Sequence, residues 1–172
     1  MQTHPYDILP LADGGKLIFT PCPGTKGIAL EESLSQLRQA GASAVISLTP
    51  QTEMARLQVE GLPDACHKRG LDWFHLPVED DAAPAAEFDQ GWAREREKIL
   101  AILDEEGALA IHCKGGSGRT GLMAAIILLE RGMGLEQVTS TVQRLRPKAL
   151  RLQAHVEHLV ELADKLGKGG QS

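Results

Sequence analysis

The sequence predicts a single α/β domain with a mostly parallel central sheet flanked by helices. Short apolar runs of strand length, such as residues 44–48 and 108–111, alternate with stretches whose apolar residues recur at helical spacing. This alternation is typical of βαβ units, in which parallel strands are joined by helices that cover the sheet. The 172 residues suit one domain with a sizeable core. We therefore expect one domain at 1–166 and a disordered tail at 167–172.

The first half of the chain is expected to alternate strands and helices. Residues 16–19 are predicted as an edge strand, followed by the turn residues Pro23 and Gly24. Leucines at helical spacing predict a helix over 30–40, and Gly41 follows it as a C-cap residue should. The other elements predicted in this half are a strand at 44–48, short helices at 52–59 and 62–68, and a strand at 71–76.

The second half is expected to be mainly helical around one buried strand. An amphipathic pattern predicts a long helix over 88–106, and its charged run at 94–98 is interpreted as a solvated face. The apolar run at 108–111 predicts a buried strand. The helices predicted after it are a buried one that starts near Arg119 and includes 122–129, one at 135–145 that Pro147 stops, and a last one at 151–166.

Composition and charge argue against several classes of function. The net charge is −5, so non-specific binding of nucleic acid or of an anionic membrane is not expected. No apolar stretch is long enough to span a bilayer, and the N-terminus lacks a signal-peptide pattern, so a cytoplasmic protein is expected. Three cysteines, Cys22, Cys66 and Cys113, suit free thiols in a reducing compartment. No paired metal-ligand spacing is present, and we expect neither a metal nor another cofactor.

Residues 110–121 combine a cysteine, an arginine and four glycines between an apolar run and a helix-like run. The loop should end at a helix N-terminus, where free N–H groups and the helix dipole favour a bound dianion. Its glycines allow positive φ, so that successive N–H groups can point inward as an anion-binding nest. The predicted phosphate-binding residues are Lys114, Gly115, Gly116, Ser117, Gly118 and Arg119. We call residues 113–118 the phosphate loop.

Cys113 and Arg119 lie six positions apart, which in a tight loop can place a thiol and a guanidinium on opposite sides of one small anion. The planar fork of arginine matches two phosphate oxygens. The surrounding N–H groups should favour a thiolate, which is a nucleophile aimed at phosphorus. The Thr120 hydroxyl could donate a hydrogen bond to the sulfur and help it to leave in a second step. A lone buried cysteine usually serves packing, but this combination favours catalysis.

An acidic segment at 77–84, which we call the acid loop, directly follows the predicted strand at 71–76. Phosphoryl transfer from an alcohol or phenol needs a proton for the leaving oxygen, and a carboxylic acid on a loop over the phosphate provides it. Glu79, Asp80 and Asp81 are the candidates. The alternative interpretation is a solvated loop, but a nucleophile without an acid would be an incomplete catalyst.

The run His112-Cys113, five residues, Arg119-Thr120 resembles the signature of the cysteine-dependent protein tyrosine phosphatase superfamily. Over about residues 21–162 the chain is most similar to the dual-specificity group, and within it to the kinase-associated phosphatases, which act on cyclin-dependent kinases. The resemblance implies a protein tyrosine phosphatase-like fold. It rests on the signature, on the turn at Pro23-Gly24, on residues 34–41 before a strand, and on residues 75–80.

The resemblance also implies a metal-independent phosphomonoester hydrolase that acts on phosphoproteins, at phosphotyrosine with or without phosphoserine and phosphothreonine. Cys113 would attack phosphorus while Asp80, in the position of the family's general acid, protonates the leaving oxygen; Asp81 is the alternative acid. Water would then hydrolyse the phosphocysteine with Asp80 as the base. The expected partner is a phosphoprotein substrate, for which a protein kinase is one candidate.

Two positions depart from the family pattern. Related phosphatases place a glutamine after the last proline to orient the hydrolytic water; here His155 occupies that point, with Gln153 two residues earlier. Lys114 replaces an aromatic residue of the kinase-associated phosphatases, and a basic residue there is also found in phosphoinositide phosphatases. Two alternatives therefore stay open: a phosphatase for a small-molecule, phosphoinositide or RNA 5′ phosphate, and a phosphate-binding adaptor with weak catalysis.

Overall fold

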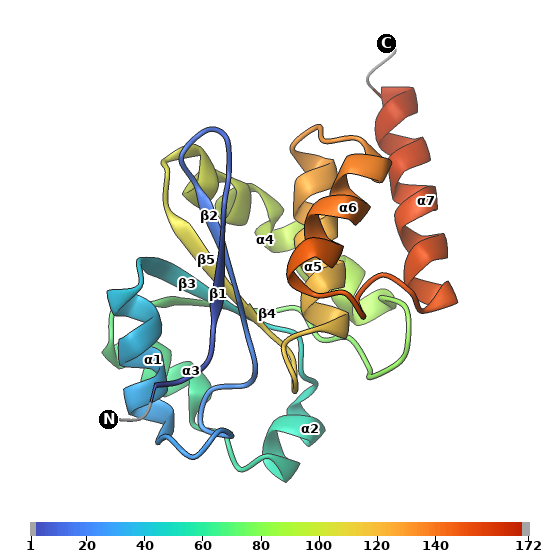
Figure 1. The fold of residues 1–172 in the computed structure, drawn as a ribbon. Coiled ribbons are helices and arrows are strands. Elements are labelled where there is room, and N and C mark those ends of the chain that lie inside the picture. The colour runs from blue at the N-terminus through green and yellow to red at the C-terminus, as the bar shows by residue number, and fades with distance from the viewer. Residues whose placement is uncertain (1–2, 170–172) are drawn as a thin grey trace.

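A computed structural model describes residues 3–169 of the chain (Figure 1). Strands and helices alternate in the first two thirds, and three helices complete the chain. In order they are β1 (Asp7–Pro10), β2 (Lys16–Thr20), α1 (Leu30–Gln39), β3 (Ala42–Ser47), α2 (Gln51–Arg56), α3 (Leu62–Lys68), β4 (Asp72–His75), α4 (Ala86–Asp104), β5 (Ala108–His112), α5 (Gly118–Glu130), α6 (Leu135–Leu145) and α7 (Gln153–Gly169).

The five strands form one sheet in the order β1-β2-β5-β3-β4. β2, β5, β3 and β4 are mutually parallel, whereas β1 pairs antiparallel with β2, so the predicted mostly parallel sheet is confirmed. The prediction of residues 16–19 as an edge strand is wrong, because β1 covers the outer side of β2. β1 is a four-residue, largely exposed strand that ends in a proline, so its apolar pair Ile8-Leu9 is a weak strand signal in the sequence.

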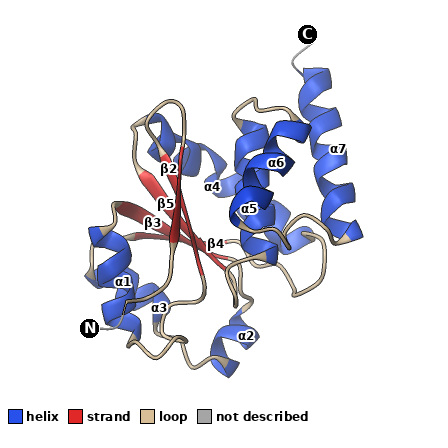
Figure 2. Ribbon diagram, in the orientation of Figure 1, coloured by secondary structure: helices blue, strands red, loops and turns tan. Residues whose placement is uncertain are grey.

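Helices cover both faces of the sheet (Figures 1 and 2). α1 and α3 lie on one face, and α4 and α5 lie on the other, with α6 and α7 packed outside α5. Side chains of β5 alternate between the two cores: Ala108 and Ala110 face α1 and α3, while Leu109 and Ile111 face α5. This two-sided burial explains why parallel strands read as continuous apolar runs in the sequence.

α5 is the central helix of the molecule, since every residue from Arg119 to Leu129 is buried. Gly121 in its first turn lets the connection between α6 and α7 come close. A Cβ atom at this glycine would lie 2.5 Å from the Ala149 Cβ atom, so only a residue without a side chain fits. The start of α5 and the α6–α7 connection are therefore packed together, which matters for the site described below.

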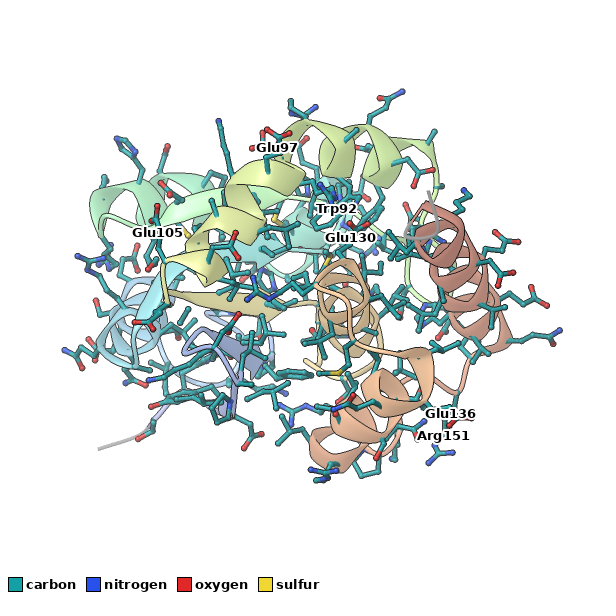
Figure 3. The ribbon with its side chains drawn as sticks, turned by 90° about the horizontal axis from the view of Figure 1, so that it is seen from above. Trp92, Glu97, Glu105, Glu130, Glu136 and Arg151 are labelled. Atoms are coloured by element: carbon teal, nitrogen blue, oxygen red, sulfur yellow. The ribbon has the colours of Figure 1, made fainter. Side chains whose placement is uncertain are left out.

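α4 spans its side of the sheet and is tied to the end of α5. Arg96 Nε donates to Glu130 Oε2 at 2.6 Å, and Trp92 and Glu130 line one small cavity between α4, α5 and α7 (Figure 3). Arg94, Glu97 and Lys98 are exposed, as predicted for a charged solvated face, but Glu95 and Arg96 of the same run are half-buried, because Arg96 binds Glu130. The Phe88 and Trp92 rings are stacked with centroids 6.5 Å apart. These contacts fix the helix that follows the acid loop.

Most predicted elements are present, with shifted ends. α2 ends at Arg56 and not at residue 59, because Gln58 takes a left-handed φ of 60° that no helix can continue. α7 begins at Gln153 and runs to Gly169, three residues past the expected end of the domain at 166. Residues 170–172 of the predicted tail lie outside the described residues. Within residues 3–169, no helix has the length and hydropathy needed to cross a bilayer.

Candidate active site

The carboxyl ends of the four parallel strands meet at one edge of the sheet, and the phosphate loop leaves this edge between β5 and α5. In open α/β sheets ligands bind at this edge. α2, which follows β3, and the acid loop, which follows β4, start from the same edge. The fold therefore brings together segments that lie more than sixty residues apart in the chain, as contacts between Arg119 and Glu53 show.

Cys113 is the first residue of the phosphate loop, and its side chain is 3% exposed. Two donors approach its sulfur. The Gly116 N–H lies 3.3 Å from Sγ, and the Thr120 hydroxyl lies 3.2 Å from it. Hydrogen bonds from an N–H and a hydroxyl favour a sulfur that carries negative charge.

Two carbonyl groups of the phosphate loop accept hydrogen bonds from other segments of the chain. The Cys22 N–H donates to the Lys114 carbonyl at 3.0 Å, and Arg146 Nε donates to the Gly116 carbonyl at 2.8 Å. Gly116 has a φ of 80°, and a Cβ atom there would lie 2.6 Å from the Pro21 nitrogen. With these carbonyls bound elsewhere, the N–H groups of the loop are free to face the centre, as in an anion-binding nest.

The first turn of α5 adds donors on the same side. The first hydrogen bond of the helical type in this turn runs from the Gly121 N–H to the Ser117 carbonyl, at 2.7 Å. Earlier N–H groups of a helix have no intrahelical acceptor, and the helix dipole makes this end positive. Lys114, Gly115 and Gly118 are exposed around the opening. The predicted phosphate-binding residues are thus contiguous and open to solvent at one end.

His112 is fully buried behind Cys113. One ring nitrogen, Nδ1, lies 2.9 Å from the Cys113 carbonyl and must donate, because a carbonyl only accepts. Nε2 therefore accepts from the Ser47 hydroxyl at 2.6 Å, and Ser47 accepts in turn from the Trp73 indole N–H at 2.8 Å. Burial lowers the pKa of His112 to about 4, so the ring is neutral at physiological pH. This chain of hydrogen bonds links β4, β3 and β5 and holds the Cys113 carbonyl.

Arg119 is held in place by a residue that we did not single out in the sequence. Its Nη1 and Nη2 groups donate to the two carboxylate oxygens of Glu53 at 2.9 and 2.8 Å, and Nη1 also donates to the Val78 carbonyl at 2.9 Å. Burial by itself would lower the pKa of Arg119, but hydrogen bonding to Glu53 and the nearby Cys113 and Asp80 raise it overall. The guanidinium is therefore permanently charged.

The Arg119 guanidinium group has five N–H donors, and two of them remain available for a ligand. Three are used by Glu53 and Val78. Nε–H and the second Nη2–H remain, and they lie on one edge of the planar group, which is the fork that matches two oxygens of a phosphate. Asp80 Oδ1 lies 3.7 Å from Nε, on this edge. The free edge of Arg119 and the acid loop therefore face the same space.

The acid loop presents Asp80 in a tight turn. The Ala82 N–H donates to the Glu79 carbonyl at 3.2 Å, which places Asp80 and Asp81 at the two central positions. Asp81 has a φ of 59°, a conformation that aspartate tolerates better than most residues. Both carboxyl groups are exposed. Asp80 contacts Arg119, whereas no hydrogen bond or ion pair of Asp81 is found among the described side chains.

The two predicted candidates for holding the hydrolytic water lie differently. Gln153 is exposed, and its amide group donates to Glu157 Oε1 at 2.9 Å. His155 is buried, and its Nε2 lies 2.8 Å from the Ala82 carbonyl in the acid loop. Of these two residues, His155 contacts the acid loop, whereas Gln153 contacts a residue of its own helix.

Two residues that hold the site, Glu53 and Arg146, were not predicted from the sequence, because each contacts residues far away in the chain. Glu53 lies on a short helix, and its one signal is a carboxylate on the same buried face as Met54. Arg146 follows α6; besides Gly116 it binds Asp7 at 2.7 Å and lies over the Phe19 ring at 5.6 Å. Nothing in the local pattern of Arg146 separates it from an exposed arginine at the end of a helix.

The parts of this site define a class of protein. The Cys113 sulfur accepts hydrogen bonds from Gly116 and Thr120, Arg119 has a two-donor edge that Glu53 does not use, and the Asp80 carboxyl group lies beside that edge. Among residues 3–169, no cluster of side chains suited to hold a metal ion is found. A doubly covered α/β sheet with this constellation at its carboxyl edge is that of a cysteine-based phosphatase.

The particular family follows from comparison with known proteins. A family described as "Polymorphic toxin system, DSP-PTPase phosphatase" matches residues 23–133, and the chain belongs to it. The match begins after β2 and includes the acid loop, the phosphate loop and the whole of α5.

Curated relatives point to the same group. The chain is 26% identical over 140 residues to cyclin-dependent kinase inhibitor 3 of Sus scrofa, which covers 80% of this chain and 65% of that protein. It is 27% identical over 128 residues to protein tyrosine phosphatase type IVA 3 of Bos taurus, covering 70% of this chain and 65% of that protein. The chain thus spans slightly less than two thirds of the length of these relatives.

Solved structures confirm the predicted fold. Kinase associated phosphatase, in a form with serine in place of its catalytic-site cysteine, superposes with a TM-score of 0.84 at 22% identity, covering 97% of this chain and 98% of that one. A mutant form of Tk-PTP gives a TM-score of 0.73 at 25% identity, covering 94% and 97%. The resemblance to the dual-specificity group, and to kinase-associated phosphatases within it, is therefore confirmed.

Proposed function

We propose that the protein is a metal-independent phosphomonoester hydrolase that acts on phosphoproteins through a phosphocysteine intermediate. The observation that supports this most is the arrangement around Cys113. Its sulfur accepts hydrogen bonds from Gly116 and Thr120, and the edge of Arg119 that Glu53 leaves free faces Asp80. Nucleophile, phosphate-binding fork and proton donor therefore share one opening.

In the first step the Cys113 thiolate attacks phosphorus. An S–P bond forms and the P–O bond to the leaving group breaks, while the Asp80 carboxyl gives its proton to the leaving oxygen. The N–H groups of the phosphate loop and the free edge of Arg119 hold the equatorial oxygens, where negative charge is spread in the transition state. His112 and Glu53 touch no substrate in this scheme and act by fixing the loop and the guanidinium.

In the second step water attacks the phosphocysteine. Its proton goes to the Asp80 carboxylate, the S–P bond breaks, and inorganic phosphate leaves. The Thr120 hydroxyl, 3.2 Å from Sγ, stabilises the departing thiolate. The cycle returns Asp80 to its protonated form and the sulfur to its charged form, so that no co-reactant besides water is needed.

A phosphoprotein is the substrate class that the relatives favour. The names cyclin-dependent kinase inhibitor 3 and kinase associated phosphatase connect two similar proteins with kinases. A phosphorylated protein kinase is accordingly the first partner to test. The exposed position of Asp80, 69% accessible at the rim, suits phosphate carried on a large molecule.

The test is hydrolysis of p-nitrophenyl phosphate in reducing buffer with a chelator. Wild-type protein should turn over, and Cys113→Ser should not. Asp80→Asn should reduce kcat/KM by about 10²-fold or more for phenyl phosphate, which has a poor leaving group, and much less for p-nitrophenyl phosphate. A wild-type protein without activity would leave only the adaptor alternative, and an active Cys113→Ser protein would exclude the covalent route.

Lys114 supports a second candidate substrate class. It is exposed beside Cys113, where its ammonium group can meet a second anionic group on the substrate. A phosphoinositide, a small phosphorylated metabolite and an RNA 5′ phosphate all offer one. A panel of these compounds beside a phosphotyrosine peptide, each with wild type and Lys114→Ala, separates the classes: a rise in KM restricted to one compound class identifies it.

A further inference from the structure

We propose that His155 is a positioning residue that holds the acid loop, and with it Asp80, over the phosphate loop. This inference rests on the proposed function, because it assigns His155 a part in the proton transfer by Asp80. His155 itself touches neither the reacting phosphorus nor the leaving group in this proposal. It acts through one hydrogen bond to the backbone of the loop.

The bond falls on the turn that carries Asp80. His155 Nε2 lies 2.8 Å from the Ala82 carbonyl, and the N–H of the same Ala82 closes the turn by donating to Glu79 at 3.2 Å. A carbonyl only accepts, so Nε2 must carry the hydrogen. Movement of Ala82 would displace Asp80, two residues earlier in the same turn.

The other side of the turn has an anchor of its own. Arg119 Nη1 donates to the Val78 carbonyl at 2.9 Å. The exposed residues 79–81 are thus held at both flanks, by Arg119 from α5 and by His155 from α7. Between these two anchors Asp80 Oδ1 lies 3.7 Å from Arg119 Nε. The distance between the acid and the phosphate-binding fork is therefore set by two side chains from different helices.

His155 is well placed to act as a rigid anchor. Its side chain is 3% exposed, and its own N–H donates to the Leu152 carbonyl at 3.0 Å at the start of α7. One turn later Leu159 is buried in the main core, which fixes α7 against α5. A buried imidazole on a packed helix loses little further freedom when it binds the loop, so the hydrogen bond restrains the loop and not the histidine.

Protonation does not remove this anchor. Burial lowers the pKa of His155, and the Arg119 cation acts in the same direction, whereas the Ala82 bond and the carboxylates of Asp81 and Asp80 act in the opposite one. The pKa of the neighbouring His158 is itself lowered by burial. The neutral ring with hydrogen on Nε2 and the imidazolium both donate from Nε2. The acid loop should therefore stay anchored throughout the pH range in which the protein is folded.

Loss of the anchor has a distinctive kinetic signature. Attack by Cys113 needs the phosphate loop and Arg119, which His155 does not touch, whereas protonation of the leaving oxygen needs Asp80 in place. The effect of removing the donor should therefore grow as the leaving group becomes poorer. A role of His155 in general stability would affect all substrates alike.

The experiment compares His155→Leu, which removes the donor, with His155→Gln, whose amide nitrogen can replace Nε2. We expect His155→Leu to lower kcat/KM for phenyl phosphate by about tenfold or more, part of the 10²–10⁴ that a general acid supplies, and to change kcat/KM for p-nitrophenyl phosphate much less. His155→Gln should recover most of the loss. His158→Leu, the same change one turn away on α7, is the matched control and should leave both rates unchanged.

A second arm tests dependence on the acid. In an Asp80→Asn background, His155→Leu should cause no further loss of kcat/KM with phenyl phosphate. Both substitutions act on the same proton transfer, so their effects are not additive. Equal losses on both substrates, or a full additional loss in the Asp80→Asn background, would overturn the proposal. If Asp80→Asn itself shows no leaving-group dependence, the proposed role of Asp80 fails first, and the two failures are thereby distinguished. Thermal unfolding of each variant identifies any that do not fold; if leucine is one of them, His155→Phe, an aromatic ring without a donor, takes its place.

Discussion

At the scale of single residues, the most consequential interaction is the buried ion pair between Arg119 and Glu53. Its two hydrogen bonds are 2.8 and 2.9 Å long, and both side chains are less than a tenth exposed. A buried pair of this kind adds little net stability compared with apolar residues, but removal of one partner leaves the other charge uncompensated. Its value here is orientation: Glu53 occupies one fork of Arg119 and leaves the other for phosphate.

Glu53→Ala should therefore destabilise the fold and impair the enzyme together. We expect a loss of about 3–5 kcal/mol in the free energy of unfolding, the usual effect of stranding one buried charge. kcat/KM should also fall, because Arg119 loses the partner that fixes its plane. Urea unfolding and phosphate release measure the two effects. Glu60→Ala, which removes an exposed carboxylate between α2 and α3, should change neither, and a Glu53→Ala protein as stable as this control would contradict the assignment.

At the scale of elements, the phosphate loop is shaped by what surrounds its carbonyl groups. Cys22, which follows β2, and Arg146, which follows α6, bind two of them, and His112 binds a third. At Gly116 the loop passes close to another backbone segment. A Cβ atom added to this glycine would lie 2.6 Å from the Pro21 nitrogen. Its neighbour Gly115 has nothing within 4 Å of the same position. Two adjacent glycines therefore have different reasons to be present.

Gly116→Ala and Gly115→Ala should separate these reasons. Alanine at 116 meets backbone atoms and a left-handed φ of 80°, so the loop must shift, and we expect a loss of about 1–3 kcal/mol in stability and most of the activity. Alanine at 115 meets open space and should be close to neutral in stability. Urea unfolding and kcat for p-nitrophenyl phosphate test the pair. Similar behaviour of the two variants would show that the steric argument is wrong.

The elements themselves were largely predictable from the sequence. Leu62–Lys68 and Leu135–Leu145 have the predicted ends, because apolar spacing and a terminating glycine or proline coincide there. β1 was missed, since two adjacent apolar residues followed by Pro10 are a weak strand signal, and the strand depends on pairing with β2. The wrong edge assignment of β2 followed from that omission.

At the scale of the whole molecule, some residues of the site are neighbours in the sequence, and others are brought together only by the fold. The phosphate loop could be predicted because its donors, its sulfur and Arg119 lie within one short run of sequence. Glu53, Arg146 and the contact of His155 with Ala82 could not, because each depends on which strand ends meet at the sheet edge. Only the strand order β2-β5-β3-β4, formed by crossovers on both faces, brings these segments together.

The hydrogen-bond chain from Trp73 through Ser47 to His112 crosses three strands, so its state should be visible in the stability of the whole molecule. Burial lowers the pKa of His112 from 6.5 to about 4. Between these values the unfolded chain binds a proton that the folded protein does not, so protonation favours unfolding. The contribution of His112 is therefore fully present above pH 6.5 and is lost as the pH falls toward 4.

We expect this single group to reduce the free energy of unfolding by about 1 kcal/mol between pH 7.5 and 5.5, and by about 3 kcal/mol once the pH is below 4. Urea unfolding of wild type and His112→Asn at a series of pH values measures it. Asparagine does not titrate, whereas His4, His155 and His158, whose pKa values burial also lowers, remain in both proteins and cancel in the comparison. The asparagine variant should start less stable, because it loses part of the chain, but its stability should fall less steeply with acid. Parallel pH profiles for the two proteins would mean that His112 titrates alike in the folded and unfolded states, and the neutral, Nδ1-donating ring behind Cys113 would have to be abandoned.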